Sequence, residues 1–211
     1  MWLILTFIIF IYSIIIHEIT HGLVAEKLGD PTARLQKRLT LNPIPHIDPI
    51  MSVFLPMILI ISGSPIILGA AKPVPIDPYN LKNPRRDMGI IGLAGPLSNI
   101  SLAVIFSIIA RLVLAFSPDP NILQVLATAA TLNILLAIFN LIPVPPLDGG
   151  RLLTGILPEK YAEALASIER FGIMIVLFLL LFPSSFFSLQ KVVLQITFLI
   201  FSLIFPRLPL I

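Results

Sequence analysis

Long apolar runs alternate with short segments rich in proline and charged residues along the whole chain. Runs of about 17–25 predominantly apolar residues are typical of transmembrane helices. The first run extends from Trp2 to Leu28, where Gly29-Asp30-Pro31 supplies a helix stop. The pattern predicts about five full transmembrane helices, the later four being Met88 to Phe116, Asn121 to Ile142, Phe171 to Phe187 and Leu189 to Phe205.

A sixth apolar run, Ile50 to Gly69, is interrupted by Pro56 and by Ser62-Gly63-Ser64-Pro65. Of the 14 Lys and Arg residues, four lie before it in Lys27 to Arg38 and four lie after it in Lys72 to Arg86. If the run turns back, 12 of the 14 fall on one side of the membrane, whereas crossing divides them six against eight. Positive charge concentrates on the cytoplasmic side, so the count favours a re-entrant hairpin. Length alone leaves a proline-kinked transmembrane helix open.

The composition supports an all-α polytopic membrane protein. Apolar residues make up 57% and charged residues 12%, and the mean hydropathy is +1.01. The net charge of +3 belongs to basic residues that flank apolar spans, which predicts membrane orientation and no nucleic acid partner. The chain has no cysteine, so thiolate metal ligands are excluded. The more polar stretch Arg151 to Arg170 predicts a short interfacial helix before the span Phe171 to Phe187.

One short motif, His17-Glu18-Ile19-Thr20-His21, carries both metal-ligand and acid–base groups. Residues i and i+4 of a helix lie on one face, so both imidazoles can reach one zinc ion. The adjacent Glu18 is placed to accept a proton from the attacking water. His17 lies roughly 22 Å along its helix at 1.5 Å per residue, inside a hydrocarbon layer of about 30 Å.

A catalytic zinc site needs a third protein ligand, and Asp148 is the best placed donor. It lies in Asn140-Leu141-Ile142-Pro143-Val144-Pro145-Pro146-Leu147-Asp148-Gly149-Gly150, at the end of an apolar span. An ionisable residue there is costly and indicates a functional site. The prolines and glycines predict unwound backbone, which lipid tolerates only beside protein or a water-filled cavity. Asp148 can meet the histidines only if Ile50 to Gly69 turns back.

Three other residues compete for the third ligand position: Asp48, His46 and Glu26. Glu26 follows His21 by five residues and therefore points away from the shared face of the two histidines. Asp48 is more typical of a turn or a helix cap before the Ile50 run. His46 either lines the site and binds substrate or has a structural role in its proline-rich loop.

Asn140 and Asn99 are candidates to orient substrate or to donate a hydrogen bond to an oxyanion. Asn140 lies about two turns before Asp148, and Asn99 lies in Gly95-Pro96-Leu97-Ser98-Asn99. For both residues the alternative role is an interhelical hydrogen bond.

Together these residues resemble the site-2 protease family of intramembrane zinc metalloproteases. The resemblance covers roughly residues 1–155 and rests on His17-Glu18-x-x-His21, Gly95-Pro96-x-x-Asn99 and Asn140-x-x-Pro143-x-x-Pro146-Leu147-Asp148-Gly149-Gly150. It implies that His17, His21 and Asp148 hold Zn²⁺ and that Glu18 is the general base. It also implies a metalloprotease core over residues 1–155, followed by a C-terminal pair of transmembrane helices in residues 156–211, without a PDZ or CBS domain.

The resemblance further implies cleavage of the transmembrane segment of single-pass membrane proteins, such as anti-sigma factors shortened by an earlier cut. With the charge bias, it predicts a multi-pass protein of the cell membrane whose active site faces the cytoplasmic side. Two other functions use the same residues: a metal transporter, and an inactive homologue that only binds membrane helices. Glu18 favours hydrolysis, because transport has no need for a carboxylate that is not a ligand.

Overall fold

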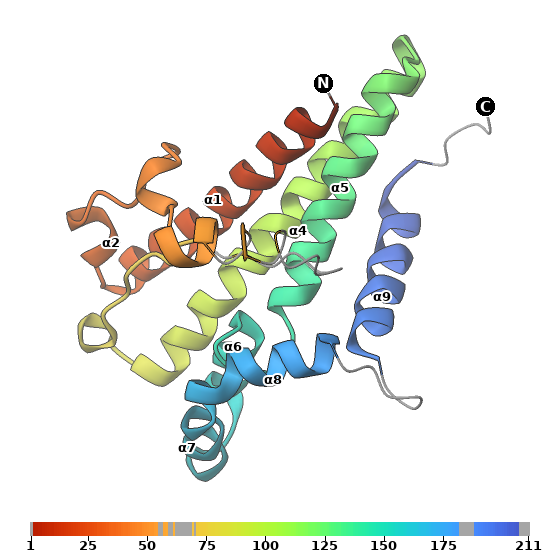
Figure 1. Cartoon of the computed structure of the whole chain (residues 1–211). Helices are drawn as coiled ribbons and strands as arrows, with labels where there is room; N and C mark the ends of the chain where they lie inside the picture. Colours follow the sequence, from red (N-terminus) through yellow and green to blue (C-terminus); the bar gives the residue numbers. More distant parts are fainter. Residues whose placement is uncertain are drawn as a thin grey trace.

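The computed structural model describes residues 2–54, 57, 58, 61, 69, 71–181 and 188–206, and every regular element in these ranges is helical. Three helices in this part of the chain are long and apolar enough to cross a membrane. They are α1 (Trp2–Leu28), α4 (Pro84–Phe116) and α5 (Pro120–Asn140), and they pack together as the body of the protein (Figure 1). The predicted all-α polytopic membrane fold is confirmed.

The first helix begins and ends at the residues that the sequence pattern predicts. At its C-terminus the Asp30 N–H donates to the Ala25 carbonyl at 2.9 Å, and the Gly29 N–H donates to the Glu26 carbonyl at 3.1 Å. Gly29 has a φ of +118°, a left-handed conformation that glycine adopts without a Cβ penalty. This pair of bonds is the Schellman motif, which satisfies helix carbonyls that would otherwise have no partner.

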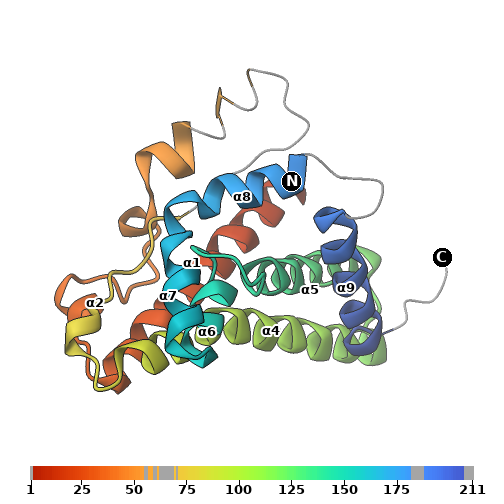
Figure 2. The same cartoon turned by 90° about the horizontal axis from the view of Figure 1, so that it is seen from below.

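Small side chains allow α4 and α5 to pack closely. Ala103 and Ala110 of α4 and Ala130 of α5 are fully buried in one apolar cluster. Phe205, just after α9 (Leu189–Ile204), completes this cluster, and α9 lies alongside α5 (Figure 2). Alanine at such positions lets helix backbones approach each other in a membrane, where packing rather than hydrophobic burial drives association.

The C-terminal region differs in detail from the predicted pair of spans. Helix α8 (Glu169–Leu181) has 13 residues and α9 has 16, while residues 182–187 of the expected span Phe171 to Phe187 lie outside the described residues. The single interfacial helix expected over Arg151 to Arg170 is wrong, because two short helices, α6 (Asp148–Ile156) and α7 (Glu159–Ser167), precede α8. Pro158 separates them, since proline cannot donate the hydrogen bond that a continuous helix needs.

The segments that flank the interrupted apolar run lie against each other. The Lys72 N–H donates at 2.8 Å to the carbonyl of His46, the last residue of the short helix η1 (Ile44–His46). Most of Ile50 to Gly69 lies outside the described residues. The structure describes this run only in η2 (Pro49–Phe54) and at Met57, Ile58, Ile61 and Gly69. Because its flanks meet, the chain leaves and returns at the same end of the helix bundle, as the re-entrant topology requires.

A buried carboxylate fixes the loops at this end. Asp30 has no solvent exposure and accepts hydrogen bonds from the Asp77 N–H at 2.8 Å and from Asn80 Nδ2 at 2.9 Å. It also accepts from Thr32, at the start of α2 (Thr32–Leu35), while Asn80 ends η3 (Pro78–Asn80). Burial opposes ionisation, but these donors outweigh it and hold the pKa of Asp30 below its ordinary value.

Candidate active site

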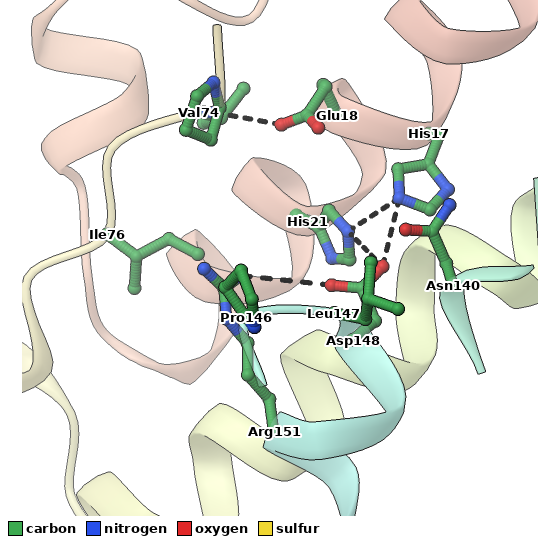
Figure 3. A pocket seen from close by; sticks show the side chains of 11 residues that line it. His17, Glu18, His21, Val74, Ile76, Asn140, Pro146, Leu147, Asp148 and Arg151 are labelled. Carbon is green, nitrogen blue, oxygen red and sulfur yellow. Dashed lines mark hydrogen bonds and ion pairs between the residues drawn. The ribbon is translucent and has the colours of Figure 1, made fainter. Parts of the chain in front are cut away.

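Two histidines from α1 and one aspartate from α6 converge on a single point (Figure 3). His17 Nε2 lies 3.0 Å from His21 Nε2 and 3.0 Å from Asp148 Oδ2, and His21 Nε2 lies 3.2 Å from the same oxygen. All three side chains are buried. The structure thus brings together residues that are 127 positions apart in the sequence.

The spacing of these three atoms fits a zinc ion. Imidazole nitrogen and carboxylate oxygen bind Zn²⁺ at about 2.0–2.2 Å, and tetrahedral ligands at that distance lie about 3.3 Å from one another. The observed separations of 3.0–3.2 Å need only a slight expansion to accept the ion. Two neutral nitrogens with one carboxylate oxygen are also a common ligand set of catalytic zinc, which keeps a fourth position open.

The second nitrogen of each imidazole has its own hydrogen-bond acceptor. His17 Nδ1 donates to Asn99 Oδ1 at 2.6 Å, and His21 Nδ1 donates to the Ile91 carbonyl at 2.7 Å. Both acceptors belong to α4. Metal-binding histidines typically donate their other N–H in this way, because the bond fixes the ring and leaves the opposite nitrogen free for the metal.

Gly95 of α4 lies directly against the two imidazoles. A Cβ at this position would lie 2.5 Å from His17 Cε1 and 2.6 Å from His17 Nε2, and it would also contact His21 Nε2. No larger residue fits there without moving the rings. Gly95 therefore lets α4 approach α1 closely enough for Asn99 and the Ile91 carbonyl to reach the histidines.

A break in the helix after α5 positions Asp148 beside the two histidines. The helix ends at Asn140, and α6 begins at Asp148 itself, where a carboxylate is favoured by the helix dipole. The predicted unwinding around Asp148 is confirmed. Arg151 Nη1 lies 3.8 Å from Asp148 Oδ1, so the two carboxylate oxygens have different neighbours: the guanidinium on one side and the imidazoles on the other.

The three donors open into a cavity of about 100 Å³. Glu18 lines it, and its Oε2 accepts a hydrogen bond of 2.9 Å from the Val74 N–H. Figure 3 shows Glu18 beside the two histidines and turned towards this extended segment. The other lining residues come from the segment after the apolar run and from the α5–α6 break: Pro73, Ile76, Asn140, Pro146, Leu147 and Arg151.

The structure separates the remaining candidates. Asn140 lines the cavity and donates from Nδ2 to the Leu136 carbonyl of its own helix at 3.0 Å. Asn99 has no exposure and is not among the residues that line this cavity. It lies behind His17 and hydrogen-bonds across helices, which supports its structural alternative. His46 is buried with Nε2 2.9 Å from the Thr40 carbonyl, which supports its structural alternative.

The two acidic rivals have structural partners. Asp48 Oδ1 accepts from the N–H groups of Ile50 and Met51 at 2.9 and 2.8 Å, the helix-capping role that the sequence favours. Glu26 is paired with Arg34 on the protein surface. Neither belongs to the converging donor group.

Sequence reasoning missed several residues around the site. Arg151 could have been found, because it follows Asp148 by one helical turn at i+3. Val74 carried no such signal, and neither did Asn133 of α5, whose Oδ1 accepts from Asn99 Nδ2 at 2.9 Å. Both residues act through contacts between segments that are distant in the sequence. Gly95 entered the sequence analysis only as the first residue of the segment that contains Asn99.

Helices sized for a membrane and a buried two-histidine, one-aspartate site with a neighbouring glutamate define a zinc metalloprotease embedded in a membrane. The family model of peptidase family M50 matches residues 115–183, which include Asp148. The chain is 34% identical over 188 residues to YwhC of Bacillus subtilis (strain 168), named as a zinc metalloprotease, with 86% of this chain and 81% of YwhC covered. The chain belongs to peptidase family M50, the site-2 protease family.

Other similar proteins carry the same kind of name. Rip2 of Mycobacterium tuberculosis (strain ATCC 25618 / H37Rv) is 32% identical over 173 residues, which cover 82% of this chain and 64% of Rip2. A solved structure, a site-2 protease from Methanocaldococcus jannaschii, aligns over 98% of this chain and 80% of that chain, with 22% identity and a TM-score of 0.47.

Proposed function

We propose that this protein is an intramembrane endopeptidase that cleaves the transmembrane segment of single-pass membrane proteins. His17, His21 and Asp148 hold its zinc ion and Glu18 is the general base. The observation that supports this most directly is the convergence of those three donors, within 3.2 Å of one another, beside a carboxylate that lines the same cavity.

Bound zinc supplies a Lewis acid that polarises the scissile carbonyl and lowers the pKa of water. Glu18 follows His17 by one residue, about 100° around the helix, so it can reach the open side of the site without being a ligand. It accepts the proton of the attacking water and passes it to the leaving amine. The Val74 N–H, 2.9 Å from Oε2, holds this carboxylate at the wall of the cavity.

We propose that Asn140 and Arg151 act on the substrate. Asn140 keeps one amide hydrogen on the Leu136 carbonyl at 3.0 Å, which orients the side chain at the end of α5 and leaves the second hydrogen for a developing oxyanion. Arg151 adds a positive charge on the opposite side of Asp148. Its attraction for negative charge at the site strengthens as the substrate excludes water.

We infer that the substrate must unwind before cleavage, because the peptide carbonyls of a helix are occupied by internal hydrogen bonds. The helix breaks around Asp148 and the extended residues near Val74 give the site walls that a straight substrate helix cannot follow. A regulator such as an anti-sigma factor, already shortened by an earlier cut, fits this need for a short and accessible span.

We also propose that the protein lies in the cell membrane with the site towards the cytoplasm. The loops fixed by Asp30, together with Arg34, Lys37 and Arg38, are at the end of α1 that carries the two histidines. Basic loops stay on the cytoplasmic side. Water would therefore reach the site from that side. The catalytic core would comprise residues 1–155, flanked by residues 156–211.

The decisive experiment compares Glu18→Gln with wild type. Glutamine keeps the size of glutamate but cannot accept the proton, so we expect full zinc content and a cleavage rate lower by about 10²–10⁴. Cleavage is followed by gel mobility of a tagged single-span substrate in proteoliposomes, and zinc by elemental analysis. Glu26→Gln is the matched control, because Glu26 lies on the same helix but is paired with Arg34 at the surface.

The outcomes separate the competing functions. Wild-type cleavage by zinc-loaded Glu18→Gln would remove Glu18 from the mechanism. Zinc uptake into proteoliposomes without cleavage would favour a transporter. Undiminished zinc in Asp148→Ala would reassign the third ligand.

A further inference from the structure

A closed set of polar side chains lies behind His17, on the side away from the cavity. Ser13 of α1, Asn99 of α4 and Asn133 of α5 are 3%, 0% and 0% exposed. Each comes from a different membrane-spanning helix, at a depth where apolar side chains surround them. Buried polar groups in this setting are costly unless each one has a partner.

The hydrogen bonds of this cluster form a chain in which each side chain donates to the next: His17 to Asn99, Asn99 to Asn133, and Asn133 to Ser13. Asn133 Nδ2 donates to Ser13 Oγ and to the Ala129 carbonyl, both at 2.9 Å. Asn133 Oδ1 then accepts from Asn99 Nδ2 at 2.9 Å, and the same Nδ2 makes a longer bond of 3.3 Å to the Ser13 carbonyl. Asn99 Oδ1 is left to accept from His17 Nδ1 at 2.6 Å. Ser13 Oγ donates in turn to the Ile9 carbonyl at 2.8 Å, so its lone pairs face Asn133.

These bonds decide which way the Asn99 amide faces. A flipped Asn99 would set its oxygen against Asn133 Oδ1, two acceptors with no hydrogen between them. It would also present an N–H to His17 Nδ1, which then has to be an acceptor. The imidazole proton would move to Nε2, the nitrogen that faces His21 and Asp148, and a protonated nitrogen cannot bind a metal.

We propose that Asn133 is a positioning residue that sets, through Asn99, which nitrogen of His17 is free to bind zinc. It touches neither the metal nor the cavity. Its two donors are fixed by Ser13 and by its own helix, so its oxygen has one orientation. This inference rests on the proposed zinc site of His17, His21 and Asp148.

The proposal predicts an effect on metal affinity that exceeds any effect on packing. Groups that orient a metal ligand typically contribute about 10–100-fold in affinity. Asn133→Leu keeps a similar volume and removes the nearer of the two acceptors of Asn99 Nδ2. Only the Ser13 carbonyl at 3.3 Å then opposes the flip. We expect the zinc dissociation constant to rise by about 10–100-fold.

The test measures zinc affinity directly, by competition with a fluorescent chelator on the full-length detergent-solubilised protein. Ser107→Ala is the matched control: Ser107 is 1% exposed on α4, and its hydroxyl donates to the Ala103 carbonyl of its own helix at 2.7 Å. We expect its zinc affinity to stay within about twofold of wild type. Melting of the zinc-free proteins shows how far each change affects folding.

A double-mutant cycle separates positioning from general packing. Asn99→Asp presents an oxygen to His17 in either orientation, so the flip no longer matters. In that background Asn133→Leu should change zinc affinity by less than about threefold. If Asn133→Leu does not fold, Ser13→Ala removes one fixed acceptor of Asn133, and we expect about fivefold weaker binding that also disappears in Asn99→Asp.

Three results would overturn the proposal. The first is wild-type zinc affinity in Asn133→Leu while His17→Ala loses the metal, which leaves the proposed function intact. The second is an equal loss from Asn133→Leu in both backgrounds, which indicates packing alone. The third is a His17→Ala protein that binds zinc as tightly as wild type, which overturns the proposed function as well.

Discussion

Substitution of Gly95 by alanine should remove zinc binding without unfolding the protein. One methyl group is added at the point where α4 meets α1. It would lie 2.5 and 2.6 Å from two atoms of the His17 ring and would also contact His21 Nε2. Carbon atoms in ordinary contact are about 3.5–4.0 Å apart, so the rings or the helices must move by roughly 1 Å.

The two imidazoles have little freedom to yield. Their Nδ1 atoms are held by Asn99 and by the Ile91 carbonyl, at 2.6 and 2.7 Å, on the same helix that carries the new methyl group. Alanine favours the helix over glycine by about 0.5–1 kcal/mol, whereas overpacking costs about 1–3 kcal/mol. The free energy of unfolding should therefore fall by only about 0–2.5 kcal/mol, while displacement of two ligands by about 1 Å should weaken zinc binding by more than 100-fold.

The assay is zinc competition against a chelator, with denaturant or thermal unfolding of the zinc-free protein alongside. Gly89→Ala is the matched control, because Gly89 also lies in α4, and its added Cβ would meet Gly155 Cα at 3.1 Å, away from the histidines. We expect that control to lose some stability and keep its zinc. Wild-type zinc affinity in Gly95→Ala, or equal loss in the two variants, would refute the close contact of α4 with the metal ligands.

Three further predictions concern other parts of the fold. The pKa of Asp30 is lowered in the folded protein, so the ionised carboxylate stabilises the fold fully above the ordinary carboxyl pKa, and this stabilisation is lost as the pH falls through the pKa of the folded protein. The melting temperatures of wild type and Asp30→Asn should therefore differ at pH 7 and converge in acid. Asn140→Ala should keep its zinc and stability but cleave more slowly, by about 10²-fold, whereas a large loss of stability with unchanged specific activity would make Asn140 structural. Single cysteines at Gln36 and Asn83, both exposed in a chain without native cysteine, should react with an impermeant thiol reagent from the same, cytoplasmic side; opposite accessibility would contradict the re-entrant topology.

Local patterns in the sequence were enough to predict the main elements and the reactive groups. The bounds of α1 follow from an uninterrupted apolar run and the glycine that ends it, and the positions of His17 and His21 on one face follow from helix periodicity. The unwound segment before Asp148 follows from its prolines, which cannot donate backbone hydrogen bonds. Each of these features depends on neighbours within a few residues.

Contacts between distant segments could be decided only by the tertiary structure. The placement of Asn99 behind His17, rather than in the cavity, depends on how α4 is rotated and how closely Gly95 lets it approach. The same holds for Val74 on Glu18 and for Asn133, because nothing near them in the sequence shows which partner they face. The sequence by itself therefore determined which residues can carry the chemistry, through helix period and local backbone chemistry. Only the packing of α1, α4 and α5 decided which residues orient them, because side-chain partners across helices depend on the rotation and separation of whole helices.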